Sequence, residues 1–313
     1  MGSVRETMCD QSRPWRVAEV LNSPIISRRK LGMLLRDDRL AAGVELAAVQ
    51  EALKLGASMV SKLEYGRRGI KASHVKTLAK LYRLDDETTR SRIDLAISAE
   101  APAWWSPYRV PEHYQQYVGL ETGADKVRTF ELVYVPGLFQ TEDYARASHA
   151  RSPRQMSDVE IARSTGLRRA RQARLHTKDH PLKVDAIISE AALRCMVGGP
   201  EVMAAQALHL AELSRSKNIT IHVLPGQVHH EAMFGPYSLV TFAEMPDLDT
   251  VYLEHYRGLY LERPEQVGEF KQTHESLRKR AMGIEETRTW LVNLASDLSA
   301  KQGAQHGKEV AQE

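Results

Sequence analysis

Residues 56–69, GASMVSKLEYGRRG, decide the fold of the first part of this chain. Helical spacing from about Ala57 to Glu64 would turn Val60 and Leu63 inward and leave the other positions facing out. Gly66 is placed to end this helix in a left-handed C-terminal cap, and a basic loop follows at once. A short helix with small polar residues outside and arginines behind it is suited to the major groove of DNA.

Two sets of candidate contact residues follow from this spacing. Side chains on the outer face of such a helix reach base edges, and the cations and hydroxyls around it hold phosphates. The expected base contacts are Ser58, Met59 and Lys62. The expected phosphate contacts are Arg28, Arg29, Ser61, Arg67, Arg68 and Lys71.

The distribution of charge supports this interpretation. Residues 27–83 hold thirteen lysines and arginines against five acidic residues, which leaves a net charge of +8. The whole chain carries only +3, so the remaining residues sum to −5. A basic module on a mildly acidic body is the electrostatic signature of a DNA-binding domain. The solvated basic face of an ordinary helical domain gives the same count, so charge alone does not decide.

Five helices are predicted around the central stretch, over residues 27–42, 45–53, 57–64, 73–82 and 85–100. Ser73 is the expected N-cap of the fourth, and an acidic cluster begins the fifth. The pattern, with E-x-G-R-R after the third helix, resembles the helix-turn-helix domain of the xenobiotic-response-element family of bacterial regulators, which includes the phage repressors. The resemblance implies an all-α domain that binds double-stranded DNA as a homodimer.

The chain departs from that family at several positions. The usual Thr-Gln pair that opens the second helix is Glu45-Leu46, and Lys54 replaces the Gly that closes it. Gly56 stands where the recognition helix usually has a Ser or Thr cap, and Asp38 where a core leucine is expected. The resemblance implies a retained fold. It leaves open an alternative function, a protein-interaction module whose degenerate helix-turn-helix binds DNA weakly or not at all.

Length and composition are those of a globular protein. The chain has 313 residues, 42% of them hydrophobic and 27% charged, and no apolar run is long enough to span a membrane. Residues 1–26 lack the apolar core of a secretory signal, and we expect a flexible arm there. The two cysteines, Cys9 and Cys195, make a poor disulfide framework, so we expect a cytoplasmic location.

A change of composition near Ala101 predicts the domain boundary. The segment APAWWSPYRVPEHY holds three prolines, which cannot continue a helix. Beyond it, strand patterns near 128–133, 181–190, 218–225, 237–244 and 250–258 alternate with helical patterns. We therefore expect an α+β protein, with an all-α helix-turn-helix domain at 27–100 and a larger mixed α/β domain at 101–299. Residues 300–313 are predicted to be a disordered tail.

Several long blocks carry a second resemblance over roughly residues 25–295. After the helix-turn-helix come WW, YVGLE, YVPGLFQTEDYARA, VGGPEVMAAQALHLAEL, ITIHVLP and VYLEHYRGLYLE, in that order. This sequence resembles a large family of actinobacterial, antitoxin-like transcriptional regulators whose C-terminal domain has no assigned biochemical function. Members are often encoded beside a small partner protein. The resemblance implies that the C-terminal domain binds such a partner, or an effector.

No motif for catalysis, a cofactor or a metal was found. The sequence has no G-x-S-x-G, no G-x-x-x-x-G-K-[ST], no H-E-x-x-H and no paired C-x-x-C. His229-His230-Glu231 and His255 fit no standard metal spacing. We therefore expect no catalytic residues, no cofactor and no metal site, and regard the chain as a non-enzyme. An enzyme hidden in the C-terminal domain, such as a degenerate hydrolase or nuclease, stays open as a rival.

The segment from Arg163 to Lys178 is basic throughout, and its role is left open. Helical spacing predicts that residues 167, 170 and 175 are buried and that 168, 171 and 174 stay outside. Such a face could contact a second stretch of DNA backbone or an acidic partner. The simpler interpretation is a solvated helix face that pairs with acids of its own domain.

Overall fold

The computed structural model describes residues 23–151, 155–230, 235–254 and 258–310, with side chains as far as Ala300. The chain divides into two compact units, which meet between Thr122 and Gly123. The expected boundary at Ala101 therefore lies about twenty residues before the division that the structure shows. Most of the predicted N-terminal arm, residues 1–22, lies outside the described residues.

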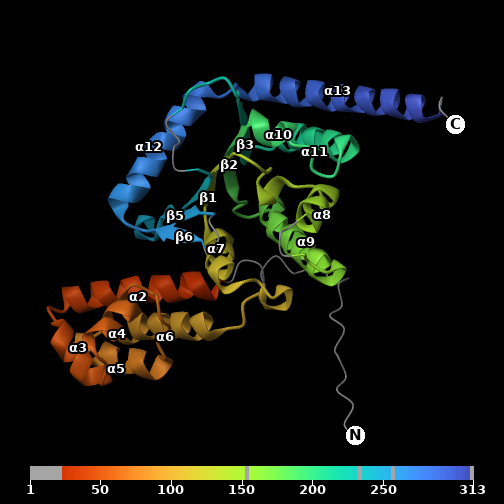
Figure 1. Cartoon of the computed structure of the whole chain (residues 1–313). Coiled ribbons are helices and arrows are strands. Elements are labelled where there is room, and N and C mark those ends of the chain that lie inside the picture. The colour runs from red at the N-terminus through yellow and green to blue at the C-terminus, as the bar shows by residue number, and fades with distance from the viewer. Residues whose placement is uncertain (1–22, 152–154, 231–234, 255–257, 311–313) are drawn as a thin grey trace, which may run out of the picture. The chain divides into compact units, whose positions relative to one another are not determined.

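The described part of unit 1 begins with five helices, drawn in red to orange in Figure 1. They are α2 (Pro24–Ala41), α3 (Leu46–Leu53), α4 (Ala57–Glu64), α5 (Ala72–Tyr82) and α6 (Asp86–Glu100). The predicted bounds of α4 agree with the structure at both ends. The predicted cap of α5 is wrong, because the helix begins one residue earlier with Lys71 at the N-cap. Asp85 caps α6 by accepting a hydrogen bond from the Thr88 amide at 2.7 Å.

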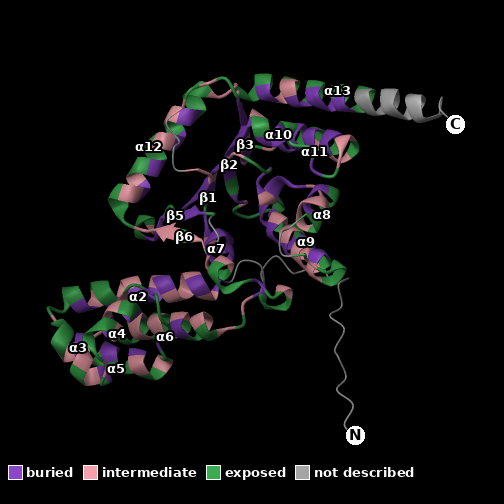
Figure 2. Ribbon diagram, viewed as in Figure 1, coloured by how far each residue is buried: buried purple, intermediate pink, exposed green. Residues whose placement is uncertain are grey.

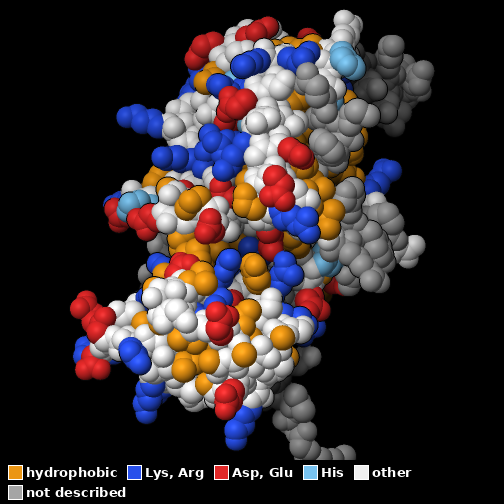
Figure 3. Space-filling view, turned by 90° about the vertical axis from the view of Figure 1, so that its left-hand side faces the viewer, with side chains coloured by type: hydrophobic (Ala, Val, Ile, Leu, Met, Phe, Trp, Pro, Cys, Tyr) orange, Lys and Arg blue, Asp and Glu red, His pale blue; other side chains and the backbone are white. Residues whose placement is uncertain are grey.

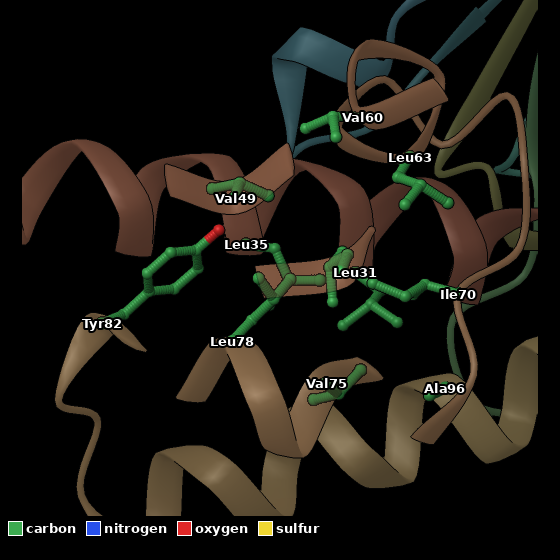
Figure 4. Close-up of a cluster of buried hydrophobic side chains, with 11 residues drawn as sticks. Leu31, Leu35, Val49, Val60, Leu63, Ile70, Val75, Leu78, Tyr82 and Ala96 are labelled. Atoms are coloured by element: carbon green, nitrogen blue, oxygen red, sulfur yellow. The ribbon is translucent and has the colours of Figure 1, made fainter. Parts of the chain in front are cut away.

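One hydrophobic cluster holds these helices together. Figure 4 shows Leu31 and Leu35 of α2 at its centre, with Val60 and Leu63 of α4 packed from one side. The other members come from α3, α5, α6 and the loop before α5, and they are Val49, Leu53, Ile70, Val75, Leu78, Tyr82 and Ala96. Helices α2 to α5 contribute residues at three- or four-residue spacing, which leaves their opposite faces exposed, as Figure 2 shows, and α6 contributes Ala96.

Unit 1 also includes the segment with the tryptophans. A short 3-10 turn (Ser106–Tyr108) precedes helix α7 (Glu112–Gly123), which the sequence did not predict. Trp104 and Trp105 are buried, and the indole nitrogen of Trp104 donates to the Thr122 hydroxyl at 3.1 Å. Trp104 therefore holds α7 against the segment that precedes it.

The start of α2 is tied to the same helix. The Ser23 hydroxyl donates to the Gly119 carbonyl at 2.7 Å and accepts the Ile26 amide as N-cap. A Cβ at Gly119 would lie 2.6 Å from the Ile25 side chain, so only glycine lets α2 and α7 approach this closely. The first helix thus begins at Pro24, before the predicted Ser27, because Ser23 supplies its cap.

Unit 2 is a mixed α/β fold, as predicted. Its strands are β1 (Lys126–Glu131), β2 (Lys183–Ser189), β3 (Ile219–Leu224), β4 (Tyr237–Thr241), β5 (Thr250–Leu253) and β6 (Leu259–Leu261). Its α-helices are α8 (Glu142–Ala150), α9 (Asp158–Gln172), α10 (Glu190–Arg194), α11 (Pro200–Leu213), α12 (Pro264–Arg280) and α13 (Ile284–Val310). Short 3-10 turns lie at Gly137–Phe139, Ala173–His176 and Pro246–Leu248.

The six strands form one sheet in the order β3-β2-β1-β4-β5-β6. β1, β2 and β3 run parallel, and β4, β5 and β6 continue the sheet antiparallel. Figure 1 shows α12 on one side of the sheet and α8 to α11 on the other. Every residue of β2 after Lys183 is buried, because a parallel strand in the middle of a sheet is covered on both faces.

Three other features of unit 2 bear on the predictions. Thr141 caps α8 through the Tyr144 amide, and Pro200 begins α11. The edge strand β6 was not predicted separately. The predicted disordered tail is wrong for residues 301–310, since α13 continues to Val310.

Candidate nucleic-acid interface

Helix α4 presents the residues predicted to read bases. Val60 and Leu63 are 1% and 6% exposed and belong to the core, so the opposite side of the helix faces outward. Ser58 and Lys62 are exposed on that side, and Met59 and Ser61 are half-buried beside them. Ser58 and Lys62 are one helical turn apart, so their side chains lie on the same face. This arrangement is the one that the spacing of residues 57–64 predicted.

The end of α4 is closed by the predicted glycine cap. Gly66 has φ of +61°, and its amide donates to the Leu63 carbonyl at 3.0 Å. The Arg67 amide donates to the Lys62 carbonyl at 2.8 Å. These two bonds form a Schellman motif, which fixes the direction in which the chain leaves the helix. The basic loop therefore starts from a defined position.

Two glycines let α2 pack tightly against this cap. A Cβ at Gly32 would lie 2.5 Å from the Leu63 carbonyl oxygen, and a Cβ at Gly66 would lie 2.5 Å from the Arg29 Cα. Both neighbours are backbone atoms, which cannot move aside without shifting a helix. The position of α4 relative to α2 therefore depends on the absence of side chains at these two residues.

An ion pair reinforces the same contact. The Arg39 guanidinium binds the Glu64 carboxylate with two bonds of 2.6 and 3.2 Å, and its third nitrogen donates to the Val44 carbonyl at 3.1 Å. The hydrogen bond to Glu64 raises the pKa of Arg39, against the lowering effect of burial. A bidentate pair of this kind fixes orientation as well as distance. It joins α2 to the last residue of the recognition helix.

Asp38 makes a second bidentate pair. Its carboxylate accepts bonds of 2.9 and 3.0 Å from Arg92 of α6, and both side chains are about 14% exposed. Asp38 therefore does not leave a gap where a core leucine was expected. It ties α2 to α6 through a partner 54 residues away, so this departure from the family is compensated within unit 1.

The predicted phosphate contacts divide into two groups. Arg67, Arg68 and Lys71 are exposed after α4. Arg29 is only 8% exposed, so its predicted phosphate contact lacks support from the structure. Arg28 is half-buried and donates to the Gly66 carbonyl at 2.9 Å. Burial, and the charge of Arg29, lower the pKa of Arg28. Arg28 therefore supports the cap directly.

The other departures concern helix ends. Glu45 and Gly56 occupy the N-caps of α3 and α4, and neither makes a side-chain cap. Leu46 is 41% exposed at the start of α3. Lys54 closes α3 in the left-handed region with φ of 53°, where glycine would be unstrained. Both helices nevertheless form, because Val49, Leu53 and the residues of α4 are held by the common core.

Sequence reasoning missed two residues beside this surface. Tyr65, the C-cap of α4, is 56% exposed. The Arg36 guanidinium lies 5.4 Å from the centre of its ring, and that of Arg67 lies 5.9 Å away. The signal for Tyr65 was present, since it stands seven residues after Ser58 and therefore on the same helical face. Nothing in the local sequence places Arg36 beside it, because the two are 29 residues apart.

The basic segment of unit 2 is less exposed than predicted. Leu167, Ala170 and Leu175 are buried, as expected, but so are Arg171 and Arg174. Arg174 donates to the carbonyls of His180 and Ala124, both at 2.9 Å. The expectation that both arginines stay outside is therefore wrong: Arg174 holds the chain at the start of β1, and Arg171 lies against Gly137.

A buried polar network joins α12 to the sheet. The Asp185 carboxylate lies 3.1 Å from the Lys126 ammonium and 3.5 Å from the ring of His274, whose other nitrogen lies 3.2 Å from the Tyr237 hydroxyl. Burial would raise the pKa of Asp185, but His274 and Lys126 outweigh it and hold that pKa well below its usual range. His274 has no exposed surface, and the network connects α12 with β1, β2 and β4.

Two further groups in unit 2 have shifted pKa values. Burial, with the nearby charge of Glu254, raises the pKa of Glu131 to about 8, against a hydrogen bond from Thr129. Burial, with the charge of Arg168, lowers the pKa of His149 to about 4. Both groups are therefore mostly neutral at pH 7.

Neither a metal centre nor a membrane segment is found in the part of the chain that the structure describes. No three His, Cys, Asp or Glu side chains there are placed to hold an ion. Of the weak metal candidates, Glu231 and His255 lie outside the described residues. No described helix has the length and hydropathy to cross a bilayer. Figure 3 shows acidic and basic side chains interspersed over the face in view.

Comparison with known families agrees with this geometry. Residues 30–91 match a family described as a helix-turn-helix domain, the class that indicates a DNA-binding regulator. Residues 114–293 match a family described as a domain of unknown function, DUF5753. The second match covers more than half of the chain, and the protein belongs to that family. No curated protein and no solved structure matches it.

Proposed function

We propose that the chain is a sequence-specific transcriptional regulator that reads double-stranded DNA with α4. The observation that carries the proposal is the fixed presentation of this helix. Gly32, Gly66 and the Arg39–Glu64 pair hold α4 on α2, while Ser58 and Lys62 stay exposed. A rigid helix with exposed polar side chains meets the geometric requirement for contacts to base edges in the major groove.

Electrostatics support the same proposal. Arg67, Arg68 and Lys71 follow the helix, in the position from which a helix-turn-helix contacts the DNA backbone. Two acids of the domain, Glu64 and Asp38, are bound to arginines and therefore oppose a phosphate less strongly. As in phage-repressor-like proteins, two copies would read two half-sites about one helical turn apart, so we propose a cytoplasmic homodimer.

For unit 2 we propose binding without catalysis. It has its own core around the six-stranded sheet, far more structure than a DNA reader needs to dimerise. The ionisable network of Asp185 and His274 is enclosed and joins α12 to the sheet. The resemblance to antitoxin-like regulators suggests a small partner protein encoded by an adjacent gene as the ligand, with a small-molecule effector as the other candidate.

A second function keeps one specific observation in its favour. The N-caps of α3 and α4 lack side-chain bonds, and Leu46 is exposed where a polar residue usually supports a phosphate contact. A helix-turn-helix that serves only protein binding would tolerate these changes. Asp38 no longer supports this alternative, because its bidentate pair with Arg92 replaces the missing core residue.

Binding of the full chain to its own upstream DNA, measured against random DNA at several salt concentrations, tests the DNA-binding proposal. We expect specific binding that weakens steeply with salt. The double variant Arg67→Ala/Arg68→Ala should lower the slope of log affinity against log salt by about 2, and weaken both DNAs alike. Binding that shows no preference and no salt dependence would favour the protein-interaction module.

Co-expression with the product of a small adjacent reading frame tests the second part. We expect a stable complex with the full chain, and a change in its DNA affinity on complex formation, because coupling between two sites is reciprocal. A small molecule that raises the melting temperature, with no captured protein, would point instead to an effector.

A further inference from the structure

Tyr65 is the exposed aromatic residue that continues the outer face of the recognition helix. It follows Ser58 by seven residues and Lys62 by three, so at 100° per residue all three side chains share one face. Its backbone is close to helical, with φ of −88° and ψ of 7°. Tyr65 is 56% exposed beside the candidate base contacts, so its ring is accessible to side chains on the same surface.

Two arginines from different elements flank the ring. Arg36 belongs to α2, whereas Arg67 belongs to the loop after α4, and their guanidinium carbons lie 5.4 and 5.9 Å from the ring centre. At such distances the flat face of a guanidinium group can lie over the face of the aromatic ring. Its N–H donors lie in the guanidinium plane, at the edge, which is the part that binds phosphate oxygens.

The support beneath Tyr65 is rigid. Gly66 follows it in a Schellman cap, Arg28 donates to the Gly66 carbonyl at 2.9 Å, and Glu64 is bound to Arg39. The backbone at Tyr65 is therefore fixed on both sides. Because the position of the ring is restricted, the ring can orient the arginines that lie against it. An exposed arginine without such support loses rotamer entropy when it binds.

We infer that Tyr65 is a positioning residue of the DNA interface, and that Arg36 is a phosphate-binding residue on α2. The ring aligns Arg36 and Arg67 toward one strand of the DNA backbone, so that α2 and the loop after α4 contact a single run of phosphates. The inference rests on the proposed function, because it needs α4 in the major groove. It adds a residue that carries no charge yet controls a charge-dependent part of binding.

The test measures affinity of the full chain for its upstream DNA and for random DNA over a range of salt concentrations. Arg36→Ala should lower the slope of log affinity against log salt by about 1 and weaken both DNAs alike. Tyr65→Ala should also lower the slope, by up to about 2, although it removes no charge. Tyr65→Phe, which keeps the ring, should retain the wild-type slope.

Arg90→Ala is the matched control for the loss of one positive charge. Arg90 is exposed on α6, and its removal should leave the slope unchanged. An unchanged slope in Tyr65→Ala, with the variant folded by circular dichroism, would overturn the inference. An equal decrease in Arg36→Ala and Arg90→Ala would also overturn it, since long-range charge would then explain both.

These outcomes are separable from failure of the proposed function. If the wild-type chain shows no salt-dependent DNA binding, both proposals are wrong. If the wild-type chain binds and Arg67→Ala/Arg68→Ala lowers the slope, but neither Arg36→Ala nor Tyr65→Ala does, only the inference about Tyr65 and Arg36 is wrong.

Discussion

The two units use charged residues in opposite ways. In unit 1 two bidentate pairs of largely buried side chains, Arg39–Glu64 and Asp38–Arg92, orient helices, and the cations after α4 stay exposed. In unit 2 several charged side chains are buried. Arg174 donates to carbonyl groups, and Asp185 lies beside Lys126 and His274. Charge in unit 1 is presented to a partner, whereas much of the charge in unit 2 maintains the fold.

The test with the largest expected effect disrupts the close contact between Gly32 of α2 and the end of α4. Gly32→Ala would place a Cβ 2.5 Å from the Leu63 carbonyl oxygen and 2.7 Å from the Gly66 amide nitrogen. Because both obstacles are backbone atoms, α2 and α4 must separate. We expect a loss of about 3 kcal/mol in the free energy of unfolding of unit 1, measured by thermal or urea denaturation, together with loss of DNA binding.

Gly69→Ala is the control for that change. Nothing lies within 4 Å of a Cβ at Gly69, and its φ is not in the left-handed region. We expect a stability close to that of the wild type. If Gly32→Ala were equally harmless, the close approach of α2 and α4 would not be what holds the recognition helix.

The success of sequence reasoning at α4, and its failures elsewhere, have the same physical origin. Helix α4 is fixed by local signals, namely apolar spacing and a glycine cap, and its bounds were predicted correctly. Helix α7 was missed because residues 117–122 are all buried, so its sequence carries no contrast between two faces. Strand β6 has only three residues, too few to show an alternation.

The predicted surroundings of single charged residues were wrong where the residue binds a partner that is far away in the sequence. Arg174 was predicted to be exposed, but the carbonyl of Ala124, fifty residues earlier, binds it. Asp38 stands where a core leucine was expected, and Arg92, 54 residues later, pairs with it. Composition and spacing cannot show such contacts, since a backbone carbonyl leaves no trace in the sequence. The neighbours of Tyr65 were missed for the same reason.

The second test concerns Glu131, a half-buried carboxyl group of unit 2. Between pH 4.5 and about 8 the folded chain keeps the Glu131 proton that the unfolded chain has lost, because burial raises the pKa of Glu131 to about 8. Stability must then fall as pH rises through this window. The full difference between the two pKa values corresponds to about 5 kcal/mol, and partial solvation reduces it to the order of 2 kcal/mol.

Glu131→Gln keeps the shape and can still accept the bond from Thr129. The variant should equal the wild type near pH 4.5 and exceed its stability by about 2 kcal/mol near pH 8, measured by urea denaturation at both pH values. Glu244→Gln, at an exposed carboxylate, should change little at either pH. A variant that is less stable than the wild type at pH 8 would mean that Glu131 is ionised and paired.

A third test examines base reading by α4. Lys62→Ala removes an exposed cation from the outer face of the helix. We expect a loss of ~1–3 kcal/mol on the specific site and a relaxed preference at one base position, measured by binding to a set of single-base variants. An equal loss on specific and random DNA would show that Lys62 binds phosphate. Base contacts would then not be separated from phosphate contacts between α4 and the loop after it.

The smallest expected effect separates stability from function within unit 1. Lys54 ends α3 with φ of 53°, a conformation that strains any residue with a Cβ and costs glycine little. Lys54→Gly should therefore stabilise unit 1 by up to about 1 kcal/mol. Thermal denaturation measures this gain. Gly43 has φ of +64°, so the Gly43→Ala variant should lower the stability of unit 1. We expect DNA affinity and its salt slope to stay unchanged in Lys54→Gly, because none of the proposed DNA contacts lies on α3. A reduced slope would show that Lys54 also binds phosphate, and that the interface extends over the end of α3.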